Sequence, residues 1–168
     1  MIDNFEKIKE MFYFNEANNM FFHLQIVQRA KDHKGEDKKV KEGAIKTYFI
    51  RSREHLDRVK EEIIFLCEHY KARAYINVAG KDFLTLQNLI LAKLAEYNLN
   101  GTIVNPRRIL NSAAGELKSR SPKWVVDVDD ISMLNNIRNK VYELYIKAHR
   151  EKESAIVAEL PTKNGVHL

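Results

Sequence analysis

Hydrophobic and polar positions follow two different periods along this chain, and each period predicts a type of element. Apolar residues recur at helical spacing in the segments 3–12, 52–70, 82–97 and 131–148. Alternating, β-branched or aromatic stretches predict strands at 21–29, 44–51, 72–78, 123–129, 154–160 and 166–168. A long lysine-rich polar loop joins the first two strands. This order favours an α+β fold, in which helices pack on a mixed or antiparallel sheet.

Residues with special backbone roles mark the boundaries of these elements. Ser52 is a good N-cap for the second helix, Gly80 interrupts the third strand segment, and Asp82 opens the next helix. A short helix is predicted from Pro106, within a turn-rich stretch. The 168 residues fit one domain. Within it, residues 1–100 can be read as an N-terminal α/β part and residues 101–168 as the start of a metal-binding part.

Composition narrows the class of protein. No apolar run approaches the roughly 18 residues that span a bilayer, and the N-terminus alternates acids and bases, unlike a signal peptide. The single cysteine, Cys67, cannot form an internal disulfide, which favours a reducing, cytoplasmic compartment. Cys67 falls in the apolar stripe of a predicted helix, so we expect a small core residue rather than a nucleophile.

Charge adds a hypothesis about partners. The formal net charge is +5 and the pI is about 9.2, which permits a polyanionic partner without requiring one. One basic segment has a single acid, Glu116, among five bases: Arg107, Arg108, Lys118, Arg120 and Lys123. This segment is either a solvated loop or a patch that faces the phosphates of a nucleic acid.

The most distinctive strand pattern is KWVVDVD, at 123–129. With a period of two, Trp124, Val126 and Val128 face one side and the acids Asp127 and Asp129 face the other. Two carboxylates side by side repel each other unless a cation neutralises them or solvent screens them, and oxygen ligands suit Mg²⁺ or Mn²⁺. The structural alternative is that Asp129 or Asp130 caps the helix that begins near Ile131.

A second polar group follows about 40 residues later, in PTKNGVHL. A turn with Lys163 and Gly165, followed by His167 on a strand, brings an ammonium group, backbone N–H groups and an imidazole together, and these are plausible phosphate contacts. The alternative is an ordinary Asn-Gly hairpin with an ordinary histidine. The remaining histidines lack metal-ligand spacing, and we expect them to be surface or half-buried residues: His23, His33, His55, His69 and His149.

Together these two motifs resemble those of the archaeo-eukaryotic primase (primase-polymerase) superfamily. WVVDVDD is similar to its first motif, Asp-x-Asp on a strand before a helix, and Gly165-Val166-His167 to its second. The resemblance covers about a quarter of the chain and implies a nucleic-acid-synthesising nucleotidyltransferase that acts on nucleic acid and nucleoside triphosphates. It implies that Asp127 and Asp129 bind catalytic Mg²⁺ or Mn²⁺ and that His167 contacts the triphosphate.

The topology of strand, helix, returning strand and tight turn makes a further prediction. We expect His167 on a strand adjacent to that of Asp127, with Lys163 and the basic segment bordering the same groove.

One part of the family pattern is missing. The third motif, a hydrophobic residue and an Asp after the histidine, has no counterpart in a sequence that holds one residue after His167. We therefore expect a fragment or a degenerate relative that is a poor catalyst by itself. The competing function is a non-catalytic nucleic-acid or protein interaction module of a phage or mobile element. Haloacid-dehalogenase-type phosphatases also begin with Asp-x-Asp, but a small residue and Thr or Val follow there, whereas Asp130 and Ile131 follow here.

Overall fold

A computed structural model describes residues 2–14, 19–35, 40–119, 123–148, 156, 158–162 and 164–168. The chain divides into two compact units. The larger unit is Phe14–Lys123, and the smaller unit combines Met1–Tyr13 with Trp124–Leu168. Helices and antiparallel sheets occur in the described part of the chain, which confirms the predicted α+β class. None of the described helices has both the length and the apolar character needed to cross a bilayer.

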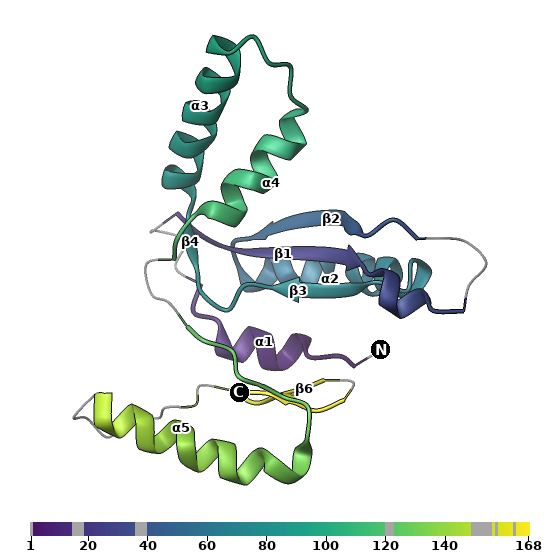
Figure 1. The fold of residues 1–168 in the computed structure, drawn as a ribbon, viewed down its shortest axis with the longest axis vertical. Coiled ribbons are helices and arrows are strands. Elements are labelled where there is room, and N and C mark those ends of the chain that lie inside the picture. The colour runs from purple at the N-terminus through teal and green to yellow at the C-terminus, as the bar shows by residue number, and fades with distance from the viewer. Residues whose placement is uncertain are drawn as a thin grey trace. The chain divides into compact units, whose positions relative to one another are not determined.

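The larger unit is built on an antiparallel sheet with the strand order β2-β1-β3, and β4 also pairs with β1. Its strands are β1 (Met20–Gln28), β2 (Gly43–Ile50), β3 (Arg73–Ile76) and β4 (Lys81–Asp82). A 3₁₀ turn, η2 (Ala30–His33), follows β1, and the long helix α2 (Arg53–His69) follows β2. Figure 1 shows α2 behind β1 and β3, so this helix covers one face of the sheet.

Alternation along β1 and β2 gives α2 its apolar partners. Leu24, Ile26, Tyr48 and Ile50 are buried on the strands, and Leu56, Ile63 and Cys67 are buried on α2. The core position predicted for Cys67 is therefore confirmed. The predicted N-cap is confirmed as well, because the Ser52 hydroxyl accepts the His55 backbone N–H at 3.1 Å.

Two further helices, α3 (Phe83–Leu99) and α4 (Pro106–Glu116), form a hairpin that stands at one end of this sheet (Figure 1). Asp82 caps α3 by accepting the Thr85 N–H at 2.7 Å, and Asn105 caps α4. The hairpin packs on the sheet face opposite α2 through a buried cluster: Phe21, Leu86, Ala113, Ala114 and Leu117.

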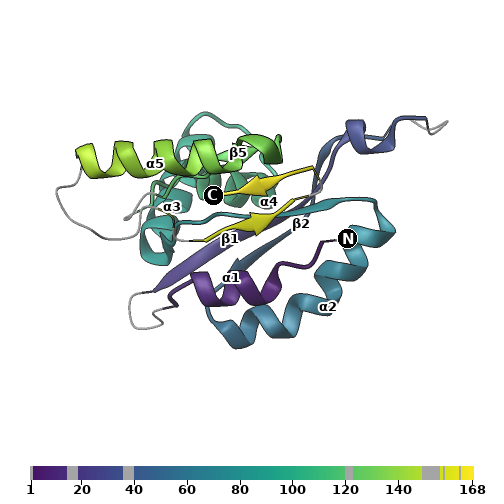
Figure 2. The same ribbon diagram turned by 90° about the horizontal axis from the view of Figure 1, so that it is seen from below.

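The smaller unit contains a three-stranded antiparallel sheet with the order β5-β7-β6. Its elements are α1 (Phe5–Met11), β5 (Asp127–Val128), the 3₁₀ turn η3 (Ile131–Met133), α5 (Leu134–Ala148), β6 (Leu160–Pro161) and β7 (Val166–His167). Figures 1 and 2 both place the short sheet between α1 and α5.

Several predictions from the sequence are wrong in detail. The strand predicted at 123–129 is shorter in the structure: β5 consists of Asp127 and Val128, and Val126 makes backbone hydrogen bonds with Leu168. Trp124, predicted to face the same side as Val128, is 88% exposed. In the segment predicted at 154–160, residues 154, 155 and 157 lie outside the described residues, and of the others only Leu160 lies on a strand, β6. His23 and His33, predicted to be surface or half-buried residues, are both buried. His23 lies on β1, and His33 lies in the 3₁₀ turn η2 that follows it.

Candidate metal and nucleotide site

The antiparallel pairing of β5 with β7 brings the two sequence motifs together. Asp127 lies directly opposite His167, and Val128 lies opposite Val166. The Nε2 atom of His167 lies 3.4 Å from Oδ1 of Asp127, close enough for an ion pair when the imidazole is protonated. The prediction that His167 lies on a strand adjacent to that of Asp127 is therefore confirmed, and the contact shows that the two side chains lie on the same side of the sheet.

The hydrogen-bond pattern explains why these two side chains meet. Val126 and Leu168 exchange both of their backbone hydrogen bonds, each 3.0 Å long. In an antiparallel ladder the next pair along makes no mutual backbone bonds, and its Cα atoms approach to about 4.5 Å, the closer of the two spacings. Asp127 and His167 occupy that closer pair, so their side chains are cross-strand neighbours by register rather than by chance contact.

Exposure alternates along this strand in the way the period-two pattern predicts. Asp127 and Asp129 are exposed, whereas Val128 between them is 2% exposed and belongs to the core. The side chains of Asp127 and His167 are 61% and 40% exposed. Both carboxylates are therefore accessible to a hydrated cation, and that of Asp127 lies beside the imidazole of His167.

Of the two residues considered for the helix cap, Asp129 and Asp130, the structure shows Asp130 in that role. Asp130 accepts the backbone N–H of Ser132 at 2.9 Å and its hydroxyl at 2.7 Å, which caps η3. These hydrogen bonds, first that from the Ser132 side chain and then that from its backbone, lower the pKa of the Asp130 carboxyl. Because Asp130 alone fills the capping role, Asp127 and Asp129 have no such part in starting the helix.

The close approach of two backbone segments explains why residue 165 is a glycine. A Cβ atom on this residue would lie 1.9 Å from the Val128 carbonyl oxygen, so only glycine fits where the turn approaches β5. The turn is closed by two bonds: the Thr162 N–H donates to the Gly165 carbonyl at 2.8 Å, and the Gly165 N–H donates to the Thr162 hydroxyl at 3.0 Å. The backbone N–H of Gly165, predicted as a phosphate contact, is thus engaged within the turn.

Contacts that no local pattern predicts hold the far edge of this sheet. The Asn4 side-chain amide donates to the Pro161 carbonyl at 3.0 Å, and Lys7 donates to the Glu159 carbonyl at 3.3 Å. Arg138 on α5 makes a two-pronged ion pair with the Glu159 carboxylate. These contacts join residues 21 to 157 positions apart, and no short-range sequence signal marks them.

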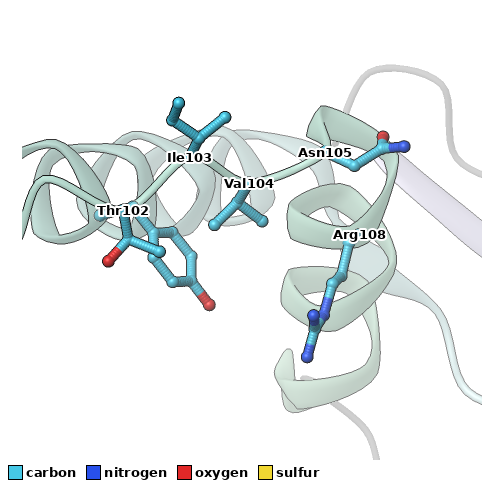
Figure 3. A pocket seen from close by; sticks show the side chains of 6 residues that line it. Thr102, Ile103, Val104, Asn105 and Arg108 are labelled. Carbon is cyan, nitrogen blue, oxygen red and sulfur yellow. The ribbon is translucent and has the colours of Figure 1, made fainter.

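The predicted nucleic-acid-binding bases belong to the larger unit. Arg107, Arg108, Lys118 and Lys123 are all exposed, and the first two lie in the first turn of α4. Figure 3 shows Arg108 at a hollow beneath the loop between α3 and α4, which is also lined by Tyr97, Thr102, Ile103, Val104 and Asn105. Arg120 and Lys163 lie outside the described residues.

In the described part of the chain, no group of three or more His, Cys, Asp or Glu side chains converges as a closed metal site. Asp127 and Asp129 offer a partial, carboxylate-only donor set, of the kind on which Mg²⁺ keeps several waters. Comparison of the chain with models of protein families, with curated proteins and with solved structures gives no match.

Proposed function

We propose that the smaller unit is the metal- and nucleotide-binding part of a primase-polymerase-type nucleotidyltransferase. The observation that carries the proposal is the cross-strand pairing of Asp127 with His167. Two short motifs that are each unspecific meet in one closely spaced pair of a small sheet, in the arrangement that the resemblance to primase-polymerases implies.

Each residue has a role that follows from its chemistry. Asp127 and Asp129 would hold Mg²⁺ or Mn²⁺ through carboxylate oxygens, with water or substrate phosphates completing the coordination. Such a cation stabilises negative charge on phosphoryl oxygens during transfer. His167, when protonated, would donate a charge-assisted hydrogen bond to a triphosphate oxygen.

The alternative, a non-catalytic module with a degenerate site, shares this fold and differs in what the acids bind. Manganese is the sharpest probe, because Mn²⁺ binding is read directly from water-proton relaxation. We expect weak Mn²⁺ binding that is lost in Asp127→Asn/Asp129→Asn, with little change in melting temperature, because both acids are exposed. We expect His167→Gln to retain Mn²⁺ and to weaken the binding of the Mn²⁺ complex of a nucleoside triphosphate.

Asp130→Asn is the matched control. It removes a neighbouring acid of the same type whose observed role is to cap η3, so Mn²⁺ binding should persist. If Mn²⁺ does not bind at millimolar concentration, or if Asp130→Asn abolishes binding as completely as the double variant does, the metal-site proposal fails. The degenerate module then becomes the better description of the chain.

A further inference from the structure

The sheet of the larger unit has a second face whose far end is not covered by any of that unit's described helices. One face packs on α2, as Figure 1 shows. On the opposite face, the α3–α4 hairpin covers the end near Phe21. Farther along the strands, one cross-strand row consists of Thr47, Gln25 and Tyr75, in neighbouring positions of β2, β1 and β3.

The side chains of this row suit the recognition of unpaired bases. Tyr75 is 42% exposed, so its ring is accessible for stacking. Its hydroxyl accepts a hydrogen bond from Nη1 of Arg29 at 3.0 Å, which places a guanidinium group beside the ring. Gln25 and Thr47 are half-buried and add amide and hydroxyl groups next to it. Aromatic rings on an open antiparallel sheet, flanked by arginine, bind the bases of single strands by stacking.

Charge is distributed very unequally between the two units. Phe14–Lys123 contains 20 Lys and Arg against 13 Asp and Glu, a net charge of +7. The remaining residues contain 8 bases against 10 acids, a net charge of −2. The whole positive excess of the protein therefore belongs to the larger unit, and a polyanion would be attracted to that unit.

Within the larger unit, the excess positive charge is not on the α2 side. Helix α2 has three bases and five acids, a net charge of −2. In the described residues 29–35 and 40–45, between β1 and the middle of β2, there are four bases and two acids. Lys46 is left out of this count because it makes an ion pair with Glu62 of α2 and belongs to the opposite face. Beside Tyr75, Arg73 makes a two-pronged ion pair with Asp32, and this hydrogen bonding, followed by the charges of Arg73, Arg29 and Lys31, lowers the pKa of the Asp32 carboxyl. Three cations thus surround that one acid at this end of the face.

We propose that the sheet face around Tyr75, opposite α2, binds single-stranded nucleic acid, with one base stacked on the Tyr75 ring and the backbone phosphates held by Arg29 and Lys31. This surface needs no metal and lies in a different unit from Asp127. It is also distinct from the α4 bases predicted from the sequence. The proposal for this surface and the proposal for the metal site can therefore be supported or refuted independently.

The test is fluorescence anisotropy with labelled 20-nucleotide dT and rU oligomers, in EDTA, at two salt concentrations. Tyr75→Ala should weaken binding roughly five- to a hundredfold, the usual effect of losing one stacked base. Tyr75→Phe keeps the ring and should change affinity less than about threefold. Arg29→Gln should lower the slope of log affinity against log salt by about one. The relative affinities for dT and rU decide between DNA and RNA.

Phe65→Ala is the matched control, because Phe65 is a 61% exposed aromatic residue on α2, the helix of the opposite, net-negative face. A second measurement distinguishes lost stacking from misfolding. In a Trp124→Phe background, Tyr75→Trp places the single indole of the protein on this face, and stacking of a base should quench its fluorescence. Absence of oligonucleotide binding at low salt would overturn the proposal. So would equal losses in Tyr75→Ala and Phe65→Ala, or an unquenched indole at saturation. Unchanged binding in Asp127→Asn/Asp129→Asn supports it.

Discussion

A buried histidine in the larger unit makes stability depend on pH in a predictable way. His23 is 5% exposed, its ring centroid lies 5.5 Å from that of Phe49, and its Nε2 atom makes no hydrogen bond within the described structure. Burial, and then the positive charge of Lys81, lower the pKa of His23 from 6.5 to about 4. Lys81 is itself buried, with its ammonium group 2.5 Å from the Ala114 carbonyl, so the imidazole has a cationic neighbour.

The direction of this pH dependence follows from whether the folded or the unfolded state binds the proton of His23 more readily. Between pH 6.5 and 4 the unfolded chain protonates His23 and the folded chain does not, so stability falls as the pH decreases through this window and is constant above it. A shift of this size corresponds to about 3 kcal/mol when fully developed, since each pKa unit is worth about 1.4 kcal/mol. Between pH 7 and pH 5 the same linkage relation gives a loss of about 2 kcal/mol.

The assay is urea unfolding followed by far-UV circular dichroism at pH 7 and pH 5, on the wild type and on His23→Phe. Phenylalanine keeps an aromatic ring against Phe49 but has no proton to bind. The measured quantity is therefore the change in the free energy of unfolding between the two pH values, not the absolute stability of the variant. We expect the variant to lose about 2 kcal/mol less than the wild type between the two pH values. His23→Gln should behave like His23→Phe. Equal losses in wild type and variants would refute the buried, neutral histidine.

Two further predictions concern the smaller unit. Gly165→Ala should destabilise its sheet by about 1–3 kcal/mol or more, because the new Cβ meets a backbone carbonyl, and faster amide exchange at Val126 and Leu168 would report it. Gly115→Ala, in α4 with open space around it, should instead stabilise by about 0.5–1 kcal/mol; equal effects of the two would contradict this account. Asp127→Lys/Asp129→Lys should leave the protein monodisperse by light scattering, because lysine protects a strand edge as well as aspartate does. The same variant should not bind Mn²⁺, and retained Mn²⁺ binding would place the metal site elsewhere.

Local patterns predicted the elements whose causes are local. Ser52 and Asp82 occupy the expected capping positions, and the apolar stripe ending at Cys67 faces the core. The opposition of Asp127 and His167 was also predictable, because a strand, a helix, a returning strand and a tight turn constrain where the next strand can pair.

Features that depend on distant partners were not predictable. The extent of β5 depends on pairing with β7, whereas hydrophobic alternation alone extends the predicted strand to Lys123. The burial of His23 depends on Phe49 and Lys81, which are 26 and 58 residues away and carry no signal of contact. The tethers from Asn4 and Lys7 end on backbone carbonyls, which every residue possesses, so their targets cannot be read from side-chain identity.

Asp127 on β5 and Asp129 just after it have a structural explanation that must be weighed against metal binding. β5 is an edge strand, and charged side chains on edges prevent pairing with other chains. Edge protection works with either sign of charge and most often uses lysine. It also gives no reason for a histidine on the paired strand, at the closely spaced register position opposite Asp127. The proposed cation and phosphate site would account for the exposed carboxylates and for the imidazole, whereas edge protection accounts for the carboxylates alone.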